Sequence, residues 1–130
     1  MRMRLEATNA ALHYMIYGGG ACVQKAVEMK ILLALRVQLN FKDHRLLITT
    51  MQCIEAIMES GDELEKEGHV FKNPYWIEFV EITGEAKLKE VINHPVESVY
   101  KLAGRLLLRY EDEAPEPLNV EPGKNEEIAI

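Results

Sequence analysis

The sequence predicts an all-α fold: an antiparallel bundle of about five helices followed by an acidic C-terminal tail. Apolar residues recur at intervals of three and four along most of residues 1–110, and clusters of Gly, Asn and Pro separate the helical stretches. The chain has 130 residues, of which 48% are hydrophobic and 28% charged, as in an ordinary one-domain globular protein. We therefore expect a helical body over 1–110 and a tail over 111–130.

The first two predicted helices are separated by glycines. The first runs from about Arg2 to Tyr17 and ends at the run 18–20, which is Gly-Gly-Gly, because glycine weakens a helix. The second runs from Ala21 to about Leu39. Its middle, residues 31–35, is apolar on every side, which is typical of a helix at the centre of a bundle.

The third predicted helix begins at His44, where Asp43 is placed to cap it. Its apolar positions step by four, three and four residues and form one face: Leu47, Met51, Ile54 and Met58. Ser60 and Glu63 have the spacing of a capping box, so the helix either continues or restarts there, and it ends near Gly68. Residues 62–67 are polar on nearly every side and are expected to face water.

Two further helices begin at a shared signature, an Asn followed at once or one residue later by Pro. Asn73 is placed to cap a helix with Pro74 in its first turn. Residues 75–83 are rich in β-formers, but the acids Glu78, Glu81 and Glu85 have helical spacing and favour a helix. Asn93 opens the last helix, whose apolar residues form a narrow packing seam: Val96, Val99, Ala103, Leu106 and Tyr110.

The net charge of −6 lies entirely in the tail. Residues 1–110 carry 14 basic and 14 acidic side chains, whereas residues 111–130 carry Lys124 and seven acids. Like charges and prolines keep such a segment from burying enough apolar surface to fold alone. We expect the tail to be extended by itself and to lie against a partner surface.

Linear motifs for catalysis or metal binding are missing from the sequence. No histidine has a His, Cys or carboxylate partner at a metal-ligand spacing; the four are His13, His44, His69 and His94. Cys22 and Cys53 are expected to be reduced, buried thiols. We therefore expect no cofactor, no metal and no enzymatic activity. A small enzyme whose site is invisible in the linear sequence is the alternative.

A row of cations on the last helix is the strongest functional signal. Lys101, Arg105 and Arg109 recur every four residues, about 6 Å apart along a helix, and such a row can follow a phosphate backbone. Three cations near the second turn extend the row if the fold brings them together: Arg36, Lys42 and Arg45. Two other readings stay open, a solvated row in which Glu97 pairs with Lys101, and a row covered by the acidic tail.

Residues 99–108, with the sequence VYKLAGRLLL, resemble the helical C-terminal region of the large subunits of CRISPR Cascade complexes. A similar helical piece is also made separately in several such systems as the small subunit. The resemblance implies a non-enzymatic helical subunit that supports the guide RNA and the target DNA strand through Lys and Arg. The neutral body departs from the basic surface expected of that family.

Residues 63–74 are similar to the middle of some phage small terminase subunits, which are helical oligomers. The basic segment that closes those proteins is not found after Asn93. The second hypothesis is therefore an assembly adaptor that binds protein, in which the cations meet acidic side chains.

Partners and location follow from these hypotheses. We expect other subunits of a larger complex, self-association in more than one copy as an open alternative, and contact with a nucleic-acid backbone. No apolar run reaches the roughly 18 residues that a membrane span needs, and an acid at Glu6 interrupts any signal-peptide core. We expect no membrane contact and a cytoplasmic protein.

Overall fold

The computed structural model describes residues 2–68, 70 and 72–110; the predicted tail and His69 lie outside them. Within the described residues the chain forms helices and no strand, so the predicted all-α class is confirmed. The helices are α1 (Arg2–Glu28), α2 (Ile31–Gln38), α3 (His44–Lys66), α4 (Pro74–Glu81), α5 (Gly84–Val91) and α6 (Glu97–Tyr110).

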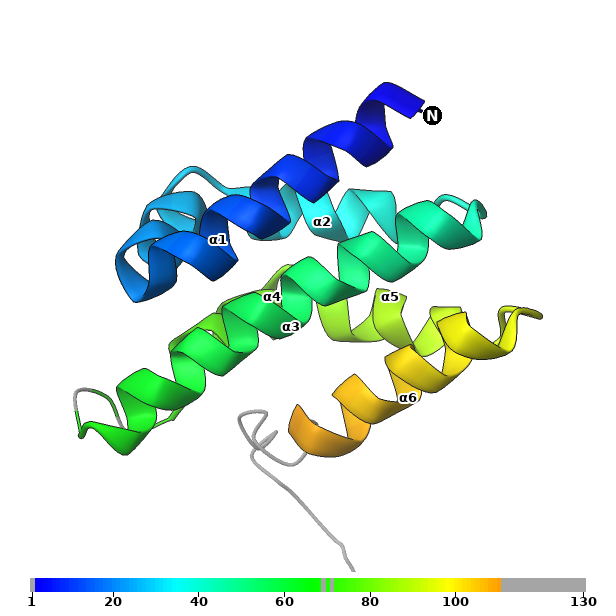
Figure 1. The fold of residues 1–130 in the computed structure, drawn as a ribbon. Helices are drawn as coiled ribbons and strands as arrows, with labels where there is room; N and C mark the ends of the chain where they lie inside the picture. Colours follow the sequence, from blue (N-terminus) through cyan, green and yellow to red (C-terminus); the bar gives the residue numbers. More distant parts are fainter. Residues whose placement is uncertain (1, 69, 71, 111–130) are drawn as a thin grey trace, which may run out of the picture.

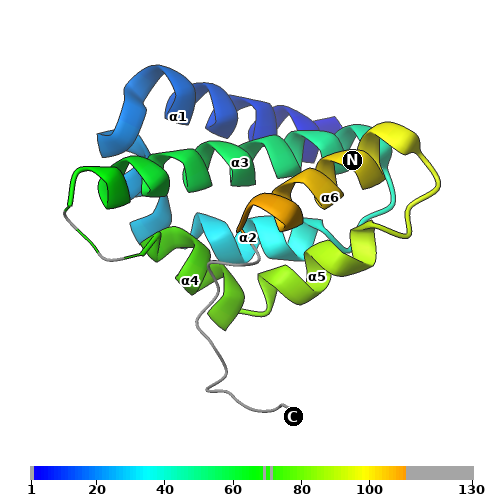
Figure 2. The same cartoon turned by 90° about the horizontal axis from the view of Figure 1, so that it is seen from below.

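The helices lie in two layers (Figures 1 and 2). One layer holds α1, α3 and α6, which run in the same direction side by side, with α3 in the middle. The other layer holds α2, α4 and α5, which run back in the opposite direction. α2 and α3 are therefore antiparallel, and α5 and α6 repeat this arrangement in the same orientation. α1 lies at one edge of its layer.

The core is centred on α3, which packs against α1, α2, α4 and α6. The predicted apolar face of this helix is confirmed, because its four residues are buried: Leu47, Met51, Ile54 and Met58. The Asp43 cap is also confirmed, since its carboxylate accepts hydrogen bonds from the backbone N–H groups of Arg45 at 2.9 Å and Leu46 at 3.1 Å.

An aromatic cluster joins α4 to α6. The ring of Trp76 lies 5.6 Å from that of Phe79 and 5.5 Å from that of Tyr110, and all three side chains are buried. The predicted cap at Asn73 with Pro74 in the first turn is confirmed. The predicted seam of the last helix is buried from Val99 onward.

The prediction that the glycine run interrupts the first helix is confirmed. Within α1, Gly19 leaves the helical conformation, with φ 68° and ψ −156°, so two helical segments meet at a kink there. One residue without a Cβ absorbs the whole kink, since positive φ is accessible to glycine at little cost. The segment after the kink ends at Glu28, before a turn in which Lys30 adopts φ 70°, so the predicted unbroken helix from Ala21 to about Leu39 was wrong.

Two further predictions about the helices need correction. The second helix is not buried all round, since Leu32 and Leu35 are buried whereas Leu33 is exposed. The predicted fourth helix is divided into α4 and α5, because Thr83 adopts φ 66° between them. The breaks after α1 and after α4 fall at Lys30 and Thr83, which are non-glycine residues in the left-handed region. The sequence carries little signal for this conformation at such residues.

α3 passes through Gly61 without restarting. A Cβ at this position would lie 1.9 Å from Oδ1 of Asn73, so the glycine lets the turn before α4 approach the helix. The prediction that residues 62–67 face water holds for Glu63, Lys66 and Glu67, but Asp62 points toward α4 and α6.

Candidate functional site

The cations of α6 lie beside a row of carboxylates on α3. Arg105 donates two hydrogen bonds to Glu55, at 2.9 and 3.1 Å. Arg109 donates to Asp62 at 2.9 Å and lies 3.6 Å from a carboxylate oxygen of Glu59. The three carboxylates on α3 are spaced by four and three residues, and the two arginines on α6 by four. The acidic side of α3 therefore faces the basic side of α6 in register.

Lys101 is paired with Glu97 of its own helix. This is the pairing expected under the hypothesis of a solvated row. Each cation of the predicted row is therefore within ion-pair distance of a carboxylate. The cations are partly to largely exposed, although Glu55 and Asp62 are mostly covered, so screening by water keeps the contribution of each pair to stability small. The local charge is balanced, and a phosphate backbone would have to compete with the resident carboxylates.

The three additional cations are not gathered around this row. Arg36 donates to the hydroxyl of Thr83 at 3.3 Å, on the α2–α5 side of the molecule. Lys42 lies in the turn before α3, where its carbonyl oxygen is 3.1 Å from Nε2 of His94. Arg45 is exposed in the first turn of α3. No ion pair to Lys42 or Arg45 is formed among the described residues.

A polar network behind the cations ties three helices together. Asp62 accepts hydrogen bonds from the hydroxyl of Tyr110 at 2.8 Å and from Nδ2 of Asn73 at 3.0 Å. Asn73 also donates to the carbonyl of Met58 at 2.8 Å. Burial and the hydrogen bond to Asp62 raise the pKa of Tyr110 well above its usual range. This network is structural, because every group in it has a partner within the protein.

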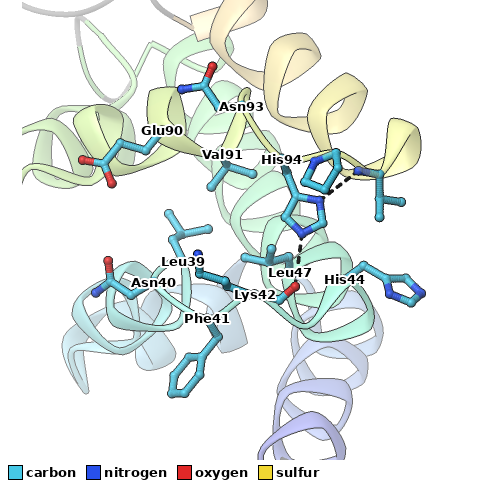
Figure 3. Close-up of a pocket in the computed structure, with 12 residues that line it drawn as sticks. Leu39, Asn40, Phe41, Lys42, His44, Leu47, Glu90, Val91, Asn93 and His94 are labelled. Atoms are coloured by element: carbon cyan, nitrogen blue, oxygen red, sulfur yellow. Dashed lines mark hydrogen bonds between the residues drawn. The ribbon is translucent and has the colours of Figure 1, made fainter.

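A cleft of about 590 Å³ opens between the α2–α3 turn and the α5–α6 turn (Figure 3). His94 lies between the two turns, with Nε2 donating to the carbonyl of Lys42 and Nδ1 accepting from the N–H of Val96 at 3.1 Å. The first bond joins the two turns and the second lies within the α5–α6 turn, so both ring nitrogens are used. The imidazole therefore has no free nitrogen for acid–base chemistry in this conformation.

The outward side of α1 carries apolar residues that no described helix covers. Met3 is 83%, Tyr14 49% and Tyr17 84% exposed. Ala7 and Ala10 are exposed between them. We call these five residues the outer stripe. They step by four, three, four and three along the helix, whereas Thr8 and Met15 face the core.

Both tyrosines of the outer stripe are held in place. The ring of Tyr17 stacks on that of His13, with 6.0 Å between centroids and 18° between planes. A hydrogen bond between the hydroxyl of Tyr14 and the thiol of Cys22 raises the pKa of Tyr14. The Gly19 kink brings Cys22 into reach of this hydroxyl. The sequence analysis did not identify this surface, although the spacing of its five residues by four, three, four and three is visible in the sequence.

The remaining candidates show no reactive arrangement. Cys53 is buried, its thiol faces the carbonyl of Thr8 at 3.5 Å, and burial raises the pKa of Cys53 to about 12. The described residues contain no group of three or more His, Cys, Asp or Glu side chains placed to hold a metal ion. Nor does any described helix combine the length and apolar character needed to cross a membrane.

Comparisons of the chain with protein-family models, with curated proteins and with solved structures gave no match. The resemblance of residues 99–108 to Cascade subunits therefore stays a prediction. A function for the chain has to be inferred from the surfaces described above.

Proposed function

We propose that this chain is a non-enzymatic assembly subunit that binds protein through the outer stripe of α1. The observation that carries the proposal is the exposure of Met3, Tyr14 and Tyr17 on one side of a helix whose other side is buried. Exposed apolar patches rimmed by polar residues mark interaction surfaces. Tyrosine and methionine are also enriched at the cores of protein interfaces.

The layered fold supports this role. α3 is covered on both sides within its layer, by α1 and by α6. α1 has a described neighbour on one side only, and its other side carries the outer stripe flanked by polar residues such as Glu6, Asn9 and His13. A helix from a partner laid on α1 would continue the layer with the same kind of packing that α3 already receives.

The charges of α6 favour protein over nucleic acid as the main partner. Arg105 and Arg109 are matched by carboxylates on α3, and Lys101 by Glu97. Nucleic-acid binding depends on cations that exchange counterions for phosphates, and a balanced row offers few. This supports the adaptor hypothesis over direct phosphate binding by α6.

Site-specific crosslinking in cells tests the proposal. A photo-crosslinking amino acid replaces Tyr17 in one variant and Leu108 in the control, because the two side chains are equally exposed, at 84% and 83%. We expect a discrete protein crosslink from position 17 and only diffuse background from position 108. A discrete crosslink from position 108 with none from position 17 would contradict the proposal.

A second candidate function follows from Lys42 and Arg45, which are free of ion pairs among the described residues and lie near the first turn of α3. They are able to contact the backbone of guide RNA or DNA, the role that the resemblance to a Cascade small subunit implies. For single-stranded nucleic acid, replacing both by Glu is expected to lower the salt slope by about 0.7 per cation removed, as measured by oligonucleotide anisotropy. Lys101→Glu is the control, and equal slopes in all variants would exclude this role.

A further inference from the structure

We infer that the partner of the outer stripe is a second copy of this chain, with the two α1 helices antiparallel across a two-fold axis. This inference rests on the proposed function, because it names the occupant of the same surface. The spacing of four, three, four and three is that of a helix-pairing seam. A two-fold interface requires a surface that is complementary to itself, and the sizes of four of these side chains meet that requirement: Ala7, Ala10, Tyr14 and Tyr17.

The size pattern sets the register. With the two-fold axis midway between Ala10 and Tyr14, each alanine of one copy faces a tyrosine of the other. Ala10 then lies opposite Tyr14 and Ala7 opposite Tyr17, while the position opposite Met3 is Ala21, beyond the Gly19 kink, so Met3 takes no part in this pairing. Large side chains thus fall into the space left by small ones at four successive levels, as interdigitating helix surfaces require.

The surface is prepared for such contact. The ring of Tyr17 stacks on that of His13, which restricts the orientation of the Tyr17 side chain. Ordering before contact reduces the entropy lost on association. The five residues of the outer stripe carry no charge, and Glu6, three residues after Met3 and four before Ala10, lies at the edge of the stripe. Residues 1–110 carry equal numbers of basic and acidic side chains, so net charge does not oppose self-association of the body.

Analytical ultracentrifugation of the full chain from about 1 μM to about 1 mM tests the inference. We expect a monomer–dimer equilibrium. Ala10→Tyr places tyrosines opposite each other and Tyr14→Ala leaves alanines opposite each other, so each change alone raises the dissociation constant roughly 30-fold or more. The double variant A10Y/Y14A restores one large and one small residue at each level, and its dissociation constant returns toward that of the natural sequence.

Two controls separate folding from association. Leu108→Ala removes an equally exposed side chain from α6 and is expected to leave the dimer unchanged. Circular dichroism is expected to show the same helix content in every variant, because residues 10 and 14 face away from the core.

The outcomes distinguish the two proposals. A chain that stays monomeric at every concentration overturns the second-copy inference, and if position 17 still crosslinks to another protein, the proposed function stands. A dimer whose double variant is as weak as the single variants overturns the antiparallel register. A dimer insensitive to positions 10 and 14 places the contact elsewhere and also overturns the inference.

Discussion

Individual residues in this chain are often explained by what lies next to them in space. Gly84 is required because a Cβ there would lie 2.3 Å from the ring of Phe79, whereas a Cβ at Gly104 would meet nothing within 4 Å. Composition alone does not separate these two glycines. Their difference is a matter of packing, and it predicts opposite effects of the same substitution.

Gly104→Ala is expected to raise the free energy of unfolding by about 0.5 to 1 kcal/mol, because it reduces the entropy of the unfolded chain and adds no clash. Gly84→Ala is expected to lower it by about 1 to 3 kcal/mol, because the added methyl displaces Phe79. Urea denaturation followed by Trp76 fluorescence measures both. A stabilised Gly84→Ala variant would show that the α4–α5 turn packs differently.

Cys53 is expected to resist alkylation in the folded protein. Burial raises the pKa of its thiol to about 12, so almost no reactive thiolate exists at neutral pH, while Cys22 is only half-buried. Mass spectrometry after brief exposure to iodoacetamide is expected to find the label on Cys22 first. Both cysteines react alike in denaturant, which is the control. Early labelling of Cys53 would mean that α1 separates readily from α3.

At the scale of elements, the helices that carry local signals were predicted well. The caps at Asp43 and Asn73, the apolar face of α3 and the seam of α6 all follow from residue spacing within one element. The left-handed turns at Lys30 and Thr83 were not predicted, because their conformations are imposed by tertiary packing on residues that rarely adopt them. The same holds for the candidate surface, since exposure of one side of α1 depends on where the other helices pack.

The Asp43 cap makes the stability of α3 depend on pH. Hydrogen bonds from the N–H groups of Leu46 and Arg45 lower the pKa of this carboxyl. A lowered pKa in the folded state means that the stabilisation is fully present above the ordinary Asp pKa of about 3.9 and is lost as the pH falls through the lowered value. Asp43→Asn keeps a capping oxygen without a titrating group, so its unfolding free energy is expected to fall less steeply below about pH 4. If the unfolding free energies of the two proteins fell equally steeply as the pH decreases below about 4, the prediction would be wrong.

Asn73 is expected to be the most costly polar residue to remove from the α3–α4 junction. Asn73→Ala removes the cap on Tyr75 and Trp76 and leaves the carbonyl of Met58 without its hydrogen bond. The expected loss is about 2 to 3 kcal/mol of unfolding free energy, measured by thermal or urea denaturation. Asn40→Ala, at an exposed turn, is the matched control and is expected to change stability by less than about 0.5 kcal/mol.

At the scale of the whole molecule, the sequence predicted the helical class but not which surface is left open. Pairing of Arg105 with Glu55 and of Arg109 with Asp62 joins residues almost fifty positions apart, so the balanced charge of α6 emerges only in the folded chain. The exposure of the outer stripe on α1 also becomes evident only in the folded chain, because it depends on where the other helices pack. We propose that function at this scale is the presentation of one end of a helical layer to a partner.

Hydroxyl-radical footprinting of the outer stripe tests this claim most directly. Oxidation rates at Met3, Tyr14 and Tyr17 are measured for the protein inside cells and for the dilute purified chain, with Leu108 as the equally exposed reference. We predict that the three stripe residues are protected in the cell while Leu108 is oxidised at the same rate in both. Stripe residues that are oxidised equally fast in both settings, while Leu108 and its neighbours on α6 are protected, would contradict the account.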